Sequence, residues 1–411
     1  MEEWKTVEIK DICTGIYEGP HATPKESQSG GIYLGIPAIS EDGHINFKNA
    51  KRISEDDLPL WTKRVTPQED DIVFTNEATL NLYAIIPAGF HGCLGRRLGL
   101  IRLNKELVNV KYLFYYFFSP DWRETISRNK VSGATVERIL MTKFPHFPVK
   151  LPPLSIQNKI ATILSSLDDK IENNRKINEN LEQQAQALFK SWFVDFEPFR
   201  DKPFVESELG MIPEGWRVGT LSEIADINPI RTLKKGQNAM YLDMKNMPTS
   251  GSFPIRWEKK DYTGGMKFKN QDTIMARITP CLENGKVAYI NFLNDNEIAF
   301  GSTEYIVMTT KDGFMPELLY FLCRDKAFKD YATVNMNGSS GRQRVSGDVI
   351  GNYKIVIPPK NIMEPLSNYY KNVMDVIRKN GFENLHLSQL RDTLLPRLMS
   401  GEIEILTNKI L

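Results

Sequence analysis

Histidine, cysteine and Gly–Lys patterns supply general bases, nucleophiles, metal ligands and phosphate-binding loops, so their spacing indicates which chemistry a chain can do. Here the five histidines form no cluster, and the four cysteines are far apart, without a CxxC or Cys/His spacing. The stretch "NGKV" contains a Gly–Lys pair, but Val287 follows where a nucleotide-binding loop needs Ser or Thr. The sequence therefore predicts no catalytic residues, no metal and no cofactor.

Composition sets the wider limits. A chain of 411 residues with 41% hydrophobic content predicts two to four folded domains. It contains no run of about 18 apolar residues, and "MEEWKTVEIK" does not resemble a signal peptide, so we expect a cytoplasmic protein without a membrane span. Residues 1–150 carry 19 basic and 19 acidic side chains, and residues 216–360 carry 20 and 15. Any nucleic-acid binding should therefore be confined to local surfaces.

The stretch from Leu151 to Phe193 predicts one long helix. Apolar or small residues recur at alternating gaps of four and three, and two asparagines continue the alternation where the apolar pattern breaks. Such a seam is typical of a coiled coil. We expect the helix to begin near Ser155, after two prolines, and to end before Pro198. The seam consists of Ile160, Leu164, Leu167, Ile171, Asn174, Asn178, Leu181, Ala185, Leu188 and Trp192.

A second copy of this helix lies 206 residues further along the chain. The constant offset carries the double proline onto Pro358–Pro359, and the two asparagines onto Asn380 and Asn384. The segments before each helix also match, for example "EDDIVFT" with "NQDTIMAR", and "SGATVERI" with "GSSGRQRV". A tandem duplication explains these matches better than chance.

The predicted fold is α/β (α+β), with two similar globular domains joined by two long antiparallel coiled-coil helices and related by a pseudo two-fold axis. At the centre of the two seams, Asn174 and Asn380 should meet and fix the register of the helices. The expected boundaries are globular domains at 1–150 and 216–360, helices at 151–200 and 361–402, a linker at 201–215 and a tail at 403–411.

The arrangement resembles the specificity subunit of type I restriction-modification systems over nearly the full chain. The phrases that carry the resemblance are the first long helix, "ELGMIPEGWRVGTLSEI", "DTIMARITPCLENGK" and "LRDTLLPRLMSGEI". It implies that each globular unit is a target recognition domain for one half of a bipartite double-stranded DNA site. It also implies that the helices set the spacer and dock two methyltransferase subunits, with restriction and translocase subunits joining in the full complex. No NPPY-like tetrad of an adenine methyltransferase is present, so methyl transfer would belong to the partners.

Side chains that could contact DNA follow from this resemblance, because Arg and Lys pair with guanine, Asn and Gln pair with adenine, and many donors bind phosphate. The loop "MNGSSGRQR" is the best candidate, since its glycines let the backbone approach a phosphate. For each basic residue the ordinary alternative is a solvated surface charge. The predicted DNA-binding residues are Arg96, Arg97, Arg128, Lys130, Ser132, Thr135 and Arg138 in the first unit, and Lys267, Lys269, Arg277, Lys286, Ser339, Ser340, Arg342, Gln343 and Arg344 in the second.

The end of the first long helix is unusually apolar. "LFKSWFVDFEPF" carries more large apolar surface than a two-helix rod can bury, which indicates an interface. We therefore predict that Trp192 and Phe193 dock a partner, with a cap between the helix and the neighbouring domain as the alternative. Two other functions remain open for the whole chain: a coiled-coil adaptor without sequence-specific DNA binding, and a self-sufficient enzyme, which the missing motifs disfavour.

Overall fold

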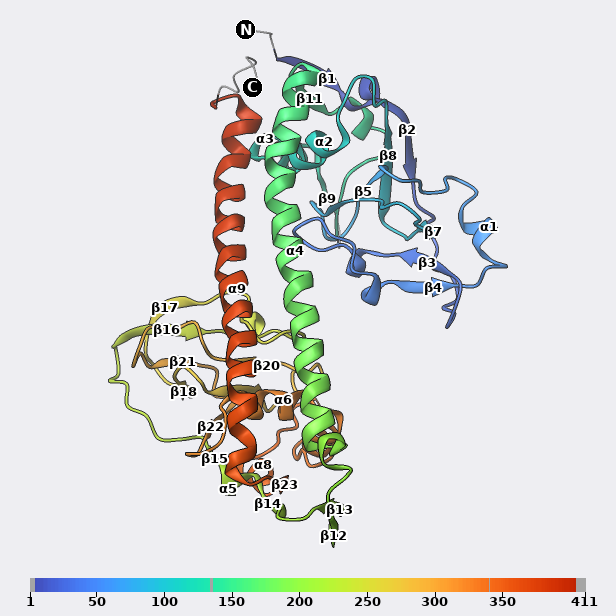
Figure 1. Ribbon diagram of the computed structural model, residues 1–411. Helices are drawn as coiled ribbons and strands as arrows, with labels where there is room; N and C mark the ends of the chain where they lie inside the picture. Colours follow the sequence, from blue (N-terminus) through green and yellow to red (C-terminus); the bar gives the residue numbers. More distant parts are fainter. Residues whose placement is uncertain (1–3, 134–135, 340, 404–411) are drawn as a thin grey trace. The chain divides into compact units, whose positions relative to one another are not determined.

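The computed structural model describes residues 4–133, 136–339 and 341–403, whose course is shown in Figure 1. The chain divides into two compact units. The first comprises the chain up to Lys170 together with the segment from Leu387 onward, and the second comprises Ile171–His386. Each unit thus contains a globular part and a portion of both long helices. This division runs across the helices, whereas the sequence-based boundaries separated helices from globular domains.

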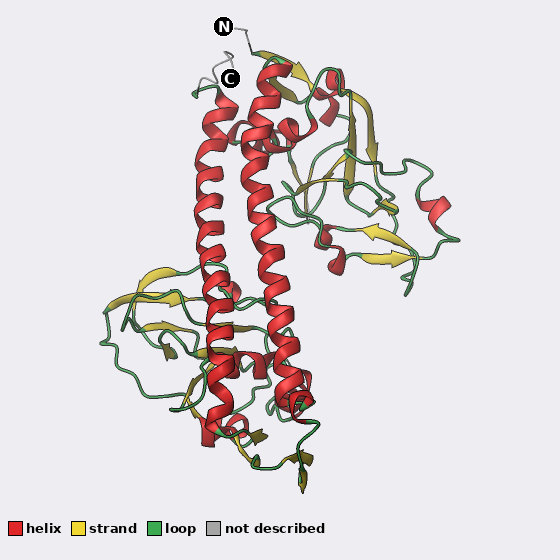
Figure 2. Cartoon of the chain, in the orientation of Figure 1, coloured by secondary structure: helices red, strands yellow, loops and turns green. Residues whose placement is uncertain are grey.

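Two long helices carry the repeat. Helix α4 spans Leu154–Phe193 and α9 spans Met363–Ser400, and both are drawn in red in Figure 2. Every predicted seam residue of α4 is buried or half-buried, as a helix with one apolar stripe requires. After α4 ends, Phe196 adopts a left-handed conformation with φ 53°, which turns the chain away from the helix axis.

The asparagines of the seam pair within the second unit, but not as predicted. Asn174 is fully buried, and its Nδ2 donates to Asn384 Oδ1 at 2.9 Å and to Glu383 Oε2 at 2.8 Å. Asn380 Nδ2 donates instead to Asn178 Oδ1 at 2.8 Å. The prediction that Asn174 and Asn380 meet is therefore wrong about the partners. Because the helices run antiparallel here, the first asparagine of each helix pairs with the second asparagine of the other.

The globular part of the first unit contains two small sheets and two strand pairs. One sheet has the order β2-β8-β5-β6 and is antiparallel, and the other has the order β4-β3-β7, in which β3 and β7 run parallel. The pairs are β1-β11 and the hairpin β9-β10. The bounds are β1 Lys5–Glu8, β2 Cys13–Glu18, β3 Gly31–Leu34, β4 Lys51–Ile53, α1 Leu58–Trp61, β5 Ile72–Thr75, β6 Tyr83–Ile85, β7 Gly92–Leu94, β8 Leu98–Leu103, α2 Val110–Tyr116, α3 Pro120–Asn129, β9 Val131–Gly133, β10 Val136–Arg138 and β11 Pro148–Leu151.

The second unit repeats this arrangement. Its antiparallel sheet has the order β15-β22-β19-β20, its mixed sheet has the order β17-β16-β21-β18 with β16 and β21 parallel, and β14 pairs with β23. The hairpin β12-β13 is an addition in the linker. The bounds are β12 Phe204–Ser207, β13 Gly210–Pro213, β14 Arg217–Thr220, α5 Leu221–Ile224, β15 Ala225–Ile227, β16 Asn238–Leu242, β17 Glu258–Asp261, β18 Lys267–Phe268, β19 Thr273–Ala276, β20 Val287–Tyr289, β21 Ala299–Gly301, β22 Tyr305–Thr310, α6 Glu317–Arg324, α7 Lys326–Val334, α8 Gly347–Gly351 and β23 Lys354–Ile357.

In each unit a tyrosine on the helix after the sheet attaches the globular part to α4. Tyr115 Oη donates to Asp168 Oδ2 at 2.6 Å in the first unit, and Tyr320 Oη donates to Glu182 Oε2 at 2.7 Å in the second. Burial raises the pKa of both phenols far above the ordinary value, so both remain donors. The aromatic run around Tyr115 is buried core, as its helical period predicts. Among the described residues no helix is long and apolar enough to cross a membrane.

We expect Asn174→Ala to destabilise the second unit by about 1–3 kcal/mol, because the half-buried Asn384 amide and Glu383 carboxylate would each lose a donor. The measurement is the free energy of unfolding in urea. Gln183→Ala removes another polar side chain from the same helix, at an exposed position, and serves as the control. Equal stability of the two variants would show that the seam does not depend on this hydrogen bond.

Candidate nucleic-acid interface

The loop between α7 and α8 is held against the end of β19, the central strand of the second unit. The N–H of Thr279 donates to the carbonyl of Gln343, and the N–H of Val345 donates to the carbonyl of Arg277, both at 3.0 Å. These two hydrogen bonds fix the loop to the residues that directly follow β19. Arg342, directly before Gln343, is exposed at the surface.

Arg344, in the same loop, is engaged inside the unit. Its Nε lies 2.9 Å from both carboxylate oxygens of Glu304, and its Nη2 lies 2.7 Å from Oε1. Its Nη1 also donates to the carbonyl of Arg342 at 3.0 Å. Hydrogen bonding to Glu304 raises the pKa of the Arg344 guanidinium. Because the guanidinium group of Arg344 is already paired with Glu304, Arg344 holds the loop in place. Arg342 faces solvent instead.

The first unit holds its hairpin β9-β10 with the same pair of bonds. The N–H of Ala78 donates to the carbonyl of Glu137 at 2.9 Å, and the N–H of Ile139 donates to the carbonyl of Asn76 at 2.7 Å. Arg138 is exposed at the end of β10. The loops that the sequence matched are therefore attached at equivalent places, each beside the end of the central strand.

One position next to the strand end forms an ion pair in both units but carries opposite charge in them. In the first unit Arg97, with φ 70°, places its Nε 3.0 Å from Glu77 Oε1. The carbonyl of Arg97 accepts from the N–H of Asn76 at 3.1 Å, as the carbonyl of Glu304 accepts from the N–H of Arg277 at 3.0 Å. Arg97 and Glu304 thus occupy equivalent positions with opposite charge.

Other basic residues predicted in the first unit lie at the surface near acidic neighbours. Lys130 Nζ donates to Glu137 Oε1 at 2.6 Å, and Arg128 pairs with Glu124 one turn earlier in α3. Arg96 is exposed in the turn between β7 and β8. Surface pairs of this kind contribute little to stability, so they can open to contact another ligand.

The predicted basic residues of the second unit are more dispersed. Lys267 Nζ lies 5.0 Å from the centre of the Tyr262 ring, and Lys286 Nζ donates to the carbonyl of Met244 at 2.6 Å. Lys269 is exposed in the turn after β18.

The structure brings together Arg277, Gln343 and Arg344 around the strand end, whereas Lys267 lies in the other sheet and Lys269 in the turn directly after it. Exposed Ser339 lies in the loop, and its carbonyl accepts from the N–H of Arg342. Ser132 is part of β9. Thr135 and Ser340 lie outside the described residues.

Sequence reasoning missed the acidic residues that hold the strand ends and loops. Glu77 and Glu304 pair with arginines 20 and 40 residues away, so no local pattern could indicate them. The sequence did indicate Asp272, because it lies in "NQDTIMAR", which matches the acidic stretch "EDDIVFT" of the first unit. It is fully buried, and it binds Arg231 and the N–H of Lys269. Burial raises the pKa of the Asp272 carboxyl in spite of these partners.

The basic side chains at this site are hydrogen-bond donors of the kind that bind a ligand. Within the described ranges no group of three or more His, Cys, Asp or Glu side chains could hold a metal ion. Burial raises the pKa of the Cys93 thiol to about 12, which keeps it protonated and unreactive.

Trp192 and Phe193 are half-buried and contact aromatic residues on either side of the linker. The Trp192 ring centre lies 5.6 Å from that of Phe199, and the Phe193 ring centre lies 6.2 Å from that of Trp216. These contacts match the cap that was the alternative to partner docking. They cover part of the apolar surface on which the docking prediction rested, and partner docking by these two residues stays a prediction.

Comparison with known proteins gives the class. The model of the type I restriction modification DNA specificity domain matches residues 1–183 and again residues 213–380. The chain therefore belongs to this family, and its two globular units are target recognition domains of a type I restriction-modification specificity subunit.

Relatives match over nearly their full length. The type I restriction enzyme MjaIX specificity subunit of Methanocaldococcus jannaschii is 27% identical, over 98% of this chain and 94% of that protein. The HindI specificity subunit of Haemophilus influenzae is 25% identical, over 98% of this chain and all of that protein. The crystal structure of the type I S subunit from M. genitalium has the same fold, with a TM-score of 0.57, 16% identity, and 97% and 96% coverage of the two chains.

Removing the acid that holds Arg344 should loosen the loop of the second unit. We expect Glu304→Ala to favour loop opening, because Arg344 loses its acidic partner, and to speed trypsin cleavage at Arg342 and Arg344 about fivefold. Cleavage is followed by mass spectrometry. Glu258→Ala removes an exposed acid from β17 as the control. Equal cleavage rates in both variants would mean that the ion pair does not hold the loop.

Proposed function

We propose that this chain reads a split double-stranded DNA site, one half with each target recognition domain, and that its long helices set the spacer and dock modification subunits. The observation that carries the proposal is the basic loop beside the central strand, which recurs in both units with the same hydrogen bonds. A duplicated loop that exposes an arginine in each copy is suited to two related but separate DNA contacts.

The arginines most suited to contact DNA bases are those that are exposed and stand in an anchored loop. Arg342 in the second unit and Arg138 in the first are exposed, and both stand in loops fixed at two points. A fixed loop loses little conformational entropy when it binds, so its arginine can distinguish bases as well as contact phosphates. Because the loop sequences differ, we expect the two half-sites to differ.

The helices suit a spacer. Helix α4 has 40 residues, which gives about 60 Å at ~1.5 Å per residue. Half-sites separated by one turn of DNA lie ~34 Å apart. A helix of this length can therefore support two readers at such a separation, and the buried asparagines would fix its register against α9.

The same helices carry exposed apolar residues at one repeated heptad position. Ile177, Tyr369 and Val376 in the second unit, and Ile163 and Leu390 in the first, are each 36–46% exposed. Each directly precedes a seam residue, at a position that is usually charged in a coiled coil. These stripes offer helical modification subunits an apolar surface beside the seam, and they replace Trp192 and Phe193 as the proposed docking residues.

Methyl transfer and DNA cleavage belong, in this proposal, to the partner subunits, and the chain acts without catalysis in the cytoplasm. The second candidate is a coiled-coil adaptor without sequence-specific binding. Long-read mapping of adenine methylation, in a host that expresses the chain with its modification partner, separates the two. Methylation at a two-part motif, lost on deletion of the chain, supports the reader, whereas methylation that is independent of the chain supports the adaptor.

We expect Arg342→Ala to reduce binding to the full site by ~10–100-fold, because a base or phosphate contact of arginine contributes about 1–3 kcal/mol. Affinity is measured by fluorescence anisotropy at fixed salt. Lys326→Ala, which removes an exposed cation from α7, is the control. If both variants bind as tightly as the wild type, the loop does not contact DNA.

The docking stripe makes a separate prediction. Replacing Tyr369 and Val376 together by Ser should weaken binding of the modification subunit at least about tenfold, since each buried apolar side chain contributes about 1.5–3 kcal/mol. Calorimetry measures the affinity, and Lys371→Ser on the same helix is the control. Unchanged affinity of the double variant would place the docking surface elsewhere.

A further inference from the structure

A cavity of about 490 Å³ lies within the first unit, on the side of α2 that contacts the long helices. Its volume falls in the range of ordinary ligand sites. Its walls come from the loop around Asp42, from α2 and α3, and from the parts of α4 and α9 that belong to this unit. The target recognition loop is not among the lining segments, so the proposed DNA contact leaves this cavity unexplained.

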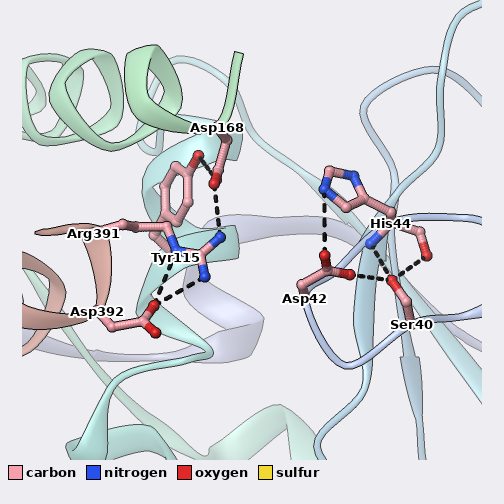
Figure 3. Close-up of polar contacts among 7 residues, drawn as sticks. All are labelled: Ser40, Asp42, His44, Tyr115, Asp168, Arg391 and Asp392. Carbon is pink, nitrogen blue, oxygen red and sulfur yellow. Dashed lines mark hydrogen bonds and ion pairs between the residues drawn. The ribbon is translucent and has the colours of Figure 1, made fainter. Parts of the chain in front are cut away.

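The inner wall is a closed ion-pair network. Asp168 accepts from Tyr115 Oη at 2.6 Å and from Arg391 Nη1 at 2.8 Å, and Arg391 Nη2 lies 2.9 Å from Asp392 Oδ1 (Figure 3). Arg391 occupies a seam position of α9, and its side chain is only 18% exposed. The positive charge on this wall is therefore already neutralised by two carboxylates.

The opposite wall is a loop held in a fixed shape. Ser40 Oγ donates to Asp42 Oδ1 at 2.5 Å and accepts from the N–H of His44 at 2.9 Å (Figure 3). Gly43, at φ 88°, lies directly on the Phe114 ring, where an added Cβ would come within 2.4 Å of Cζ. A side chain at this position would push the loop away, so the glycine keeps this wall in place.

The lining has an excess of negative charge over an apolar floor. Four carboxylates, of Glu41, Asp42, Asp168 and Asp392, face two guanidinium groups, of Arg123 and Arg391. Phe114, Phe118, Leu395 and Pro396 supply apolar surface. Pro396 lies inside α9 and has no N–H, so the usual helical donor to the carbonyl of Asp392 is absent. This carbonyl and the Asp392 carboxylate, whose side chain is 67% exposed, both offer acceptors at the edge of the cavity.

We propose that this cavity binds an arginine or lysine side chain of a partner protein. The aliphatic stem of such a side chain would pack on the aromatic and proline surface, while its charged group meets the carboxylates of Glu41 and Asp392. Charge complementarity selects this occupant, because the same lining repels DNA and other polyanions. The site is distinct from the apolar stripes of the helices and adds charge recognition to the assembly of this subunit.

The test uses the full chain and two labelled peptides, Gly-Leu-Arg-Leu-Gly and its twin with citrulline in place of arginine, which keeps the shape and removes the charge. Fluorescence anisotropy should show that the arginine peptide binds at least about fivefold more tightly, with an advantage that falls as salt rises. Equal binding of the two peptides, or tighter binding of a glutamate peptide, would overturn the proposal.

Variants locate the binding site. Glu41→Gln with Asp392→Asn should reduce the affinity for the arginine peptide toward that for the citrulline peptide, whereas Asp42 is kept because it holds the loop. Asp295→Asn with Asp348→Asn removes two exposed charges from the second unit and should change nothing. Thermal unfolding checks that all variants fold. If the first double variant folds and still prefers the arginine peptide as the wild type does, the cavity is not the site.

Discussion

The target recognition loops depend on a pair of amide–carbonyl hydrogen bonds at the end of a central strand. Thr279 and Val345 make these bonds in the second unit, and Ala78 and Ile139 make them in the first. Because these bonds involve backbone atoms alone, the side chains around the two points can vary without the loop losing its place on the sheet. This explains how two domains with a common fold can present different residues to a ligand, and why their basic residues differ in number and spacing.

The long helices combine apolar packing, which stabilises them, with a few polar pairs, which fix their alignment. Most of the seam is apolar, but in the second unit four asparagines form two crossed pairs, and in the first unit Asp168 pairs with the seam residue Arg391. A wholly apolar seam would be more stable and less selective, since it could slide by one heptad at little cost. Buried polar pairs therefore limit each unit to one alignment of its two helical segments.

Much of this architecture follows from local patterns in the sequence. The helices, the duplication and the matched loops rest on spacing that a single segment displays, so they could be predicted. The partners of Asn174 and the acid that binds Arg344 depend on which distant segments meet, and no spacing within one segment reports that. The same limit applies to the cavity beside Asp168, whose walls come from several separated stretches of chain. The contact of Trp192 with Phe199 could not be predicted either, because apolar surface alone does not distinguish an internal cap from an interface.

The opposite charges of Arg97 and Glu304 have a consequence for recombination between such domains. Arg97 and Glu304 occupy equivalent positions, but the first pairs with an acid after the strand and the second with an arginine of the loop. Exchange of an entire domain carries both members of a pair to the new context. A crossover that moved only the short turn containing Arg97 would set two guanidinium groups, those of Arg97 and Arg344, against each other. Inheritance of new specificities should therefore proceed by whole domains, with breakpoints in the helices and the linker.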